Sequence, residues 1–98
     1  MTHIYAEEHR GRYLLSAKGH AEGEDPKVCA GISAILYALA GLLDNTPEIQ
    51  TQQAELKSGD AIFRFSGGLH AQTAYRMALI GLMQIAESYP GYMEIIKK

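Results

Sequence analysis

The spacing of apolar residues along this 98-residue chain changes back and forth between the period of a strand and the period of a helix. Short segments whose residues alternate in polarity, or favour an extended backbone, lie at residues 3–8, 13–18, 49–57, 61–66 and 92–96. The first two segments flank a turn that contains Gly11, and the next two flank the turn Ser58-Gly59-Asp60. Each of these pairs predicts a β-hairpin.

A long segment with helical spacing follows the first hairpin and predicts a helix from Pro26 to about Leu43. Asp25 marks its start, because an aspartate side chain accepts hydrogen bonds from the unpaired N–H groups of a first helical turn. Pro26 lacks such an N–H group and suits the first helical position. Pro47 marks the end, because it disfavours helical backbone at the preceding residue. The predicted buried face consists of Val28, Ile32, Ile35, Leu36, Leu39 and Leu43.

A second helix is predicted over residues 70–88 and is stopped by Tyr89-Pro90-Gly91. Its predicted apolar stripe consists of Ala74, Met77, Ala78, Gly81, Leu82 and Ile85. The resulting order ββαββαβ predicts one α+β domain over residues 1–98. In this fold an antiparallel sheet is covered on one face by two helices.

The composition excludes several classes of protein. Hydrophobic residues make up 47% of the chain and charged residues 20%, which is typical of a folded domain. The net charge of -2 leaves no basic excess, so a nucleic-acid partner is not expected. The N-terminus lacks the pattern of a signal peptide, and the apolar stretch 28–43 is shorter than the ~20 residues that span a bilayer. A single cysteine forms no internal disulfide, so we expect a cytoplasmic protein without a membrane partner.

A domain of this size without a disulfide gains stability from burial against a partner. Each predicted helix also has a face of small residues beyond the face that it needs for its own sheet. These faces consist of Ala30, Ala34 and Ala38 in the first helix and of Ala74, Ala78 and Gly81 in the second. We therefore expect a homodimer.

The residues that carry chemistry are expected between Gly19 and Ser33. Cys29 lies in the first turn of the first predicted helix, where the partial positive charge of the helix N-terminus favours a thiolate. His20 lies upstream, and a cysteine nucleophile needs such a base nearby. The same two residues are also compatible with a small buried side chain in a helix and a polar side chain at a strand end.

Other reactive side chains do not form a recognisable site. His3, His9 and His70 share no metal-ligand spacing with His20 or Cys29. Neither a metal nor another cofactor is therefore expected.

Three motifs in this region and in the second helix match a known family. They are Gly19-His20-Ala21, Val28-Cys29-Ala30-Gly31-Ile32-Ser33, and Gly81-Leu82-Met83-Gln84-Ile85-Ala86-Glu87-Ser88-Tyr89-Pro90. Together they resemble the ribosomal-processing cysteine proteases called Prp, and the similarity covers nearly the whole chain.

The resemblance implies a small, dimeric cysteine endopeptidase with a His/Cys dyad. Cys29 would be the nucleophile, His20 the general base and acid, and Ser33 a supporting residue one turn after the cysteine. The substrate would be a large-subunit ribosomal protein, from which these proteases remove an N-terminal extension after a hydrophobic motif that ends in Phe. Such processing belongs to ribosome biogenesis.

The chain departs from the family pattern between the two dyad residues. The loop from His20 to Cys29 is shorter than usual, and Asp25 lies one residue further from the cysteine than the family's aspartate, which leaves it a supporting residue or only a helix cap. The loop residues Ala21, Glu22, Gly23 and Glu24 are expected to carry specificity and to favour basic or neutral substrate segments. Two alternatives follow: a non-catalytic homodimeric binding protein of the same fold, and a prophage-type member that acts on another protein.

Overall fold

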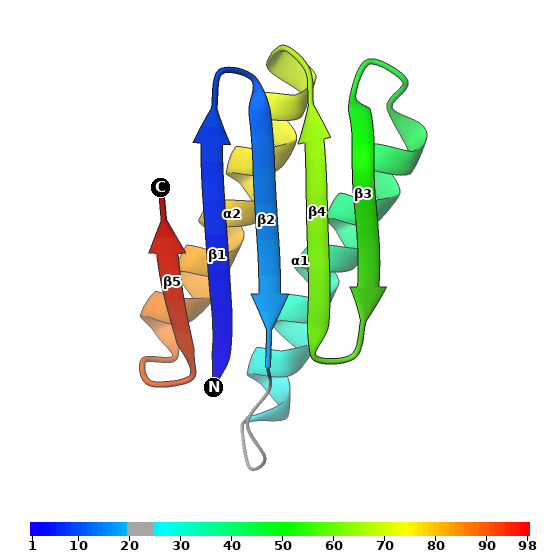
Figure 1. Cartoon of the computed structure of the whole chain (residues 1–98). Helices are drawn as coiled ribbons and strands as arrows, with labels where there is room; N and C mark the ends of the chain where they lie inside the picture. The colour runs from blue at the N-terminus through cyan, green and yellow to red at the C-terminus, as the bar shows by residue number, and fades with distance from the viewer. Residues whose placement is uncertain (20–24) are drawn as a thin grey trace.

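A computed structural model describes residues 1–19 and 25–98, and within them the predicted order ββαββαβ is confirmed (Figure 1). The strands are β1 (Thr2–His9), β2 (Arg12–Lys18), β3 (Gln50–Lys57), β4 (Asp60–Ser66) and β5 (Met93–Lys97). The helices are α1 (Pro26–Asn45) and α2 (Leu69–Ser88). Both helices lie behind the same face of the sheet, as predicted, and leave its other face open.

The strands form one sheet in the order β3-β4-β2-β1-β5. The sheet is mostly antiparallel, as predicted, and the exception is one edge, where β5 pairs parallel to β1. The path of the chain explains this pairing. Strand β2 is antiparallel to both β1 and β4, so these two strands point the same way. Helix α2 carries the chain back along the sheet after β4, so β5 again runs in the direction of β4 and β1.

Buried and exposed side chains alternate along β1, β2 and β4, and the buried side chains face the helices. The buried strand residues are Ile4, Ala6, Tyr13, Leu15, Ala17, Ala61, Phe63 and Phe65. Helix α1 covers them with Val28, Ile32, Leu36, Leu39 and Leu43, and the half-buried Ile35 packs against the same core. The predicted core face of α1 is therefore confirmed.

The buried face of α2 differs from the predicted stripe. Met77 is 66% exposed, whereas Tyr75, which does not belong to that stripe, is only 2% exposed and lies in the core. The two helices pack closely through glycines: a Cβ on Gly81 would lie 2.8 Å from Ile35 Cδ1, and one on Gly31 would lie 3.1 Å from Ile85 Cδ1. This packing turns the small residues of α2 toward α1 and turns Tyr75 toward the sheet.

Helix α1 is long and apolar enough to cross a membrane when it is judged by length and composition alone. Its most apolar residues face the sheet, however, where five of them are buried. A core helix of an α+β domain passes the same test, and α1 has that position here.

Tyr75 provides a test of the core. Its buried hydroxyl has no hydrogen-bond partner among the described residues, and burial raises its pKa above the ordinary value. We expect Tyr75→Phe to raise the free energy of unfolding by about 1 kcal/mol, because an unsatisfied polar group leaves the core. Urea unfolding measures this gain, and Tyr37→Phe, which removes an exposed hydroxyl, is the matched control.

The same tyrosine makes stability depend on alkaline pH. Since its pKa is raised in the folded state, the unfolded chain loses the phenolic proton first. Stability should therefore fall as pH rises above ~10, and less so in Tyr75→Phe. An equal loss in the variant and the parent protein would contradict the assignment of this dependence to Tyr75.

Candidate active site

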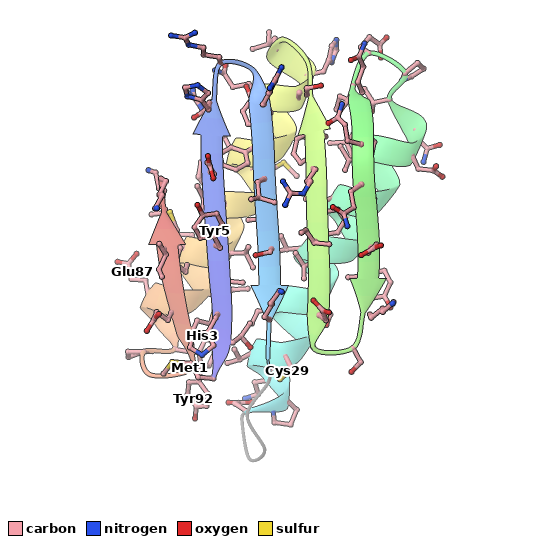
Figure 2. All side chains as sticks on the ribbon, in the orientation of Figure 1. Met1, His3, Tyr5, Cys29, Glu87 and Tyr92 are labelled. Atoms are coloured by element: carbon pink, nitrogen blue, oxygen red, sulfur yellow. The ribbon has the colours of Figure 1, made fainter. Side chains whose placement is uncertain are left out.

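Cys29 lies in the first turn of α1, near the ends of β2 and β4 (Figure 2). The local sequence forms the helix start as predicted: Pro26 is in the first turn, and the Asp25 Oδ1 atom accepts a hydrogen bond from the Lys27 N–H at 2.9 Å. The Cys29 side chain is half-buried and therefore accessible in part. The positive end of the helix favours the thiolate form at this position.

Cys29 opens onto a hollow of about 310 Å³. Its walls come from the end of β2, from α1, and from β3, β4 and the turn between them. Ser33 lines the same hollow, so the structure brings the predicted nucleophile and the predicted supporting residue together. Asp25 is not among the lining residues, and its side chain caps the helix.

Gly19 also lines the hollow, and its backbone is held from several sides. Its N–H donates to the Gly59 carbonyl oxygen at 2.8 Å, and its own carbonyl accepts from the Thr2 hydroxyl at 3.2 Å. Its φ of +85° suits glycine, and a Cβ there would lie 3.0 Å from the Met1 carbonyl oxygen. The backbone of Gly19 is therefore fixed beside the hollow.

Thr2 is a site residue that sequence reasoning missed. It is buried at the start of β1, and its hydroxyl binds the Gly19 carbonyl, which is distant in sequence. A threonine in a strand is common, and no local pattern indicates that its hydroxyl reaches another strand.

His20 and the predicted specificity residues Ala21, Glu22, Gly23 and Glu24 lie outside the described residues. Their roles stay predictions from the sequence. Among residues 1–19 and 25–98, no group of three or more His, Cys, Asp and Glu side chains could hold a metal ion.

The first-turn N–H groups of a helix such as α1 can stabilise an oxyanion, because they point toward developing negative charge. In the structure they are already paired with Asp25: the Lys27 N–H bonds its side chain, and the Val28 and Cys29 N–H groups bond its carbonyl at 3.0 and 3.4 Å. The Cys29 bond is the longest of these, so its N–H is the one most easily redirected to a substrate oxygen. The Ser33 hydroxyl, in the same hollow, is a second donor.

Comparisons with known proteins identify the family and the fold of this chain. The sequence model described as "Cysteine protease Prp" matches residues 1–94. The essential ribosomal processing protease Prp from S. aureus is similar in two solved structures. The one with a covalently linked product peptide has a TM-score of 0.84 at 20% identity, and the one with a substrate peptide has 0.76 at 19%. In both cases the match covers 100% of each chain.

A third solved structure, SMU.848 from Streptococcus mutans, has a TM-score of 0.75 at 20% identity and covers 100% of this chain and 99% of its own. A search of curated proteins finds no match. At these identities the solved structures establish the fold, and the sequence model establishes the family. The chain therefore belongs to the Prp family of cysteine proteases.

Proposed function

We propose that the protein is a cysteine endopeptidase in which Cys29 is the nucleophile and His20 is the general base and acid. The observation that carries the proposal is the position of Cys29, half-buried at the positive end of α1 in a hollow that also contains Gly19. Gly19 is the residue before His20, and its backbone is anchored at that hollow. The peptides bound to the S. aureus Prp structures support a peptide substrate.

The reaction follows from these groups. The Cys29 thiolate attacks the peptide carbonyl carbon, and the resulting oxyanion is stabilised by nearby donors. When the C–N bond breaks, protonated His20 gives its proton to the leaving amine, and a thioester remains on Cys29. His20 then takes a proton from water as the oxygen of that water attacks the thioester. This step releases the carboxylic acid product and restores the thiolate.

We propose an N-terminally extended ribosomal protein of the large subunit as the substrate. Support comes from membership in the Prp family and from the S. aureus relative, which is described as a ribosomal processing protease. The test is to incubate the purified protein with the extended ribosomal protein of the same organism and to identify the fragments by mass spectrometry. A single cut that iodoacetamide pretreatment abolishes is the expected result.

An uncut substrate would contradict this assignment. If a different protein is then cut, the prophage-type alternative is favoured. If no protein is cut but a peptide binds tightly, the non-catalytic binding protein is favoured. The cleavage assay and a measurement of peptide binding together separate the three hypotheses.

Thr2 is proposed to position the dyad through Gly19. We expect Thr2→Val to lower kcat about tenfold with little change in KM, because a small displacement of a catalytic group has a cost of this size or more. Valine keeps the shape of threonine and removes only the hydroxyl that binds the Gly19 carbonyl. Thr2→Ser keeps the hydroxyl and should restore kcat. Equal kcat in the valine variant and the parent would remove Thr2 from the site.

We propose that the protein is a homodimer that uses the outer surface of its helices. The small-residue face of α2 was expected to contact a partner, but it is covered within the chain. Ala74 and Ala78 are buried, and Gly81 packs against Ile35 of α1. The outer surface instead carries exposed large apolar residues, namely Leu42, Leu69, Met77, Ile80 and Met83. A contiguous apolar surface of this kind is typical of a protein interface.

Light scattering at micromolar concentration should give the mass of a dimer, and Ile80→Glu should give that of a monomer. Ile80 is 56% exposed, and Ile96, at 49%, is an exposed isoleucine on β5. Ile96→Glu is therefore the matched control and should leave the dimer intact. A monomer mass for the parent protein would contradict the proposal.

A further inference from the structure

Helix α1 carries a row of residues that leads away from the candidate nucleophile. Cys29, Ser33, Tyr37 and Gly41 follow one another at intervals of four, so they lie along one side of the helix. The row extends about 18 Å from Cys29 to Gly41, because a helix rises ~1.5 Å per residue. Cys29, Ser33 and Tyr37 line the hollow of the candidate active site.

A second hollow, of about 750 Å³, continues along this row. Tyr37 lines both hollows, and Ala40, Gly41 and Ala54 line the second one. Tyr37 is 67% exposed at their junction. The two hollows meet at Tyr37, and together they are called the channel, a groove that runs from Cys29 along α1 and β3.

The other wall of the channel is β3, an edge strand of the sheet. Ala54 pairs with the buried Phe63 and Leu56 with the buried Ala61, so these β3 side chains face the helix layer. Ala54 is nevertheless exposed, because α1 leaves it uncovered. Within the described residues no strand pairs with the outer side of β3, which therefore presents backbone N–H and C=O groups.

Gly41 lies beside the channel, and no packing contact within the chain requires a glycine there. A Cβ added at Gly41 would meet no atom within 4 Å, whereas one at Gly31 or Gly81 would press on an isoleucine of the opposite helix. Glycine is unfavourable in a helix interior, and close packing explains it at Gly31 and Gly81. At Gly41 it leaves space on the channel side.

We propose that this channel binds an extended peptide segment of the substrate on one side of the scissile bond, as an added strand beside β3. Addition of a strand to a sheet edge is a common mode of peptide recognition, in which main-chain hydrogen bonds provide affinity and alternate side chains provide specificity. The inward side chains of the peptide contact Tyr37 and the small residues Gly41 and Ala54. The channel accommodates about five residues, since an extended chain advances ~3.3 Å per residue. This inference rests on the proposed protease function.

Peptides of different length test the channel. Fluorescence-quenched peptides are built on the cleaved junction of the extended ribosomal protein, with two, four or six natural residues added on either the N-terminal or the C-terminal side. We expect kcat/KM to rise at least tenfold with extension on one side only and to level off near five residues. Cleavage that does not depend on length on either side would overturn the proposal and leave the protease function standing.

Two adjacent variants of β3 provide a matched pair. Ala54→Phe fills the channel, whereas Gln53→Phe adds the same bulk to the opposite face of the strand, because successive side chains alternate. Ala54→Phe should abolish the gain from extension, and Gln53→Phe should keep it. Thermal unfolding of both variants checks that they fold. Retention of the gain in a folded Ala54→Phe would overturn the proposal.

A binding measurement on an inactive variant separates the channel proposal from the protease proposal. In a Cys29→Ala background, fluorescence anisotropy should show tighter binding of the six-residue extension than of the two-residue one, and Ala54→Phe should remove that difference. If this pattern holds while the parent protein cuts no peptide, the channel stands and the protease function fails.

N-methylation tests the strand mode directly. Methylating the backbone amides of the extension one at a time should weaken binding at alternate positions, where the N–H groups face β3. An effect that does not alternate would overturn strand addition.

Discussion

Cys29→Ala is expected to lower kcat by at least about 10⁴-fold, because removal of the nucleophile from a cysteine or serine protease has an effect of this order. Alanine is small and the best helix former, so α1 should remain intact. Cleavage of the extended ribosomal protein measures the loss, and circular dichroism confirms the fold. His20→Ala should also lose most activity, since the dyad then lacks its base.

Ser33→Ala is the control variant for Cys29→Ala, because both residues line the same hollow. Ser33 is a supporting residue, so its loss should be much smaller than that of Cys29. Turnover in Cys29→Ala equal to that of the parent protein would disprove the protease hypothesis. Full activity in His20→Ala would assign the base to another group and leave Cys29 as the nucleophile.

Phe63→Ala is expected to reduce the free energy of unfolding by about 3–5 kcal/mol, which is the usual cost of truncating a fully buried phenylalanine. Phe63 is completely buried in β4, between Leu15 of β2 and Ala54 of β3. A domain of this size has a total stability of about 5–15 kcal/mol, so at least a fifth of it disappears. Urea unfolding followed by circular dichroism measures the change.

Ile62 provides the control for this experiment. It is adjacent in β4 but half-buried on the open face of the sheet, so Ile62→Ala leaves no cavity in the core. Its loss should be well below that of Phe63→Ala. Similar losses in the two variants would mean that the open face is covered, for example by a second copy of the chain.

Local patterns in the sequence predicted most elements of the fold. Alternation placed Ile4, Leu15 and Phe63 on the buried face, because the side-chain period of a strand leaves only two choices of face. Asp25 and Pro26 predicted the start of α1 because capping involves only neighbouring residues. The position of Cys29 in the first helical turn followed from that start, and the proposal that it is the nucleophile rests in part on this position.

The sequence did not predict the rotation of α2 or the direction of β5. A helix can bury several adjacent stripes, and the one that contains Tyr75 was selected by close packing against α1 through Gly31 and Gly81. The direction of β5 depends on which strand lies beside it, and that neighbour is β1, from the other end of the chain.

The sequence by itself placed Cys29, the proposed nucleophile, in the first turn of its helix, because the aspartate cap and the proline that start this helix are its neighbours in the chain. Only the tertiary structure decided what surrounds it. Thr2 bonds Gly19 across the β1–β2 hairpin, and Tyr37 lines one hollow with Ala54 of β3 because α1 crosses behind that edge of the sheet. These contacts join residues far apart in the chain, and they depend on how sheet and helices bury their apolar faces together rather than on any local pattern.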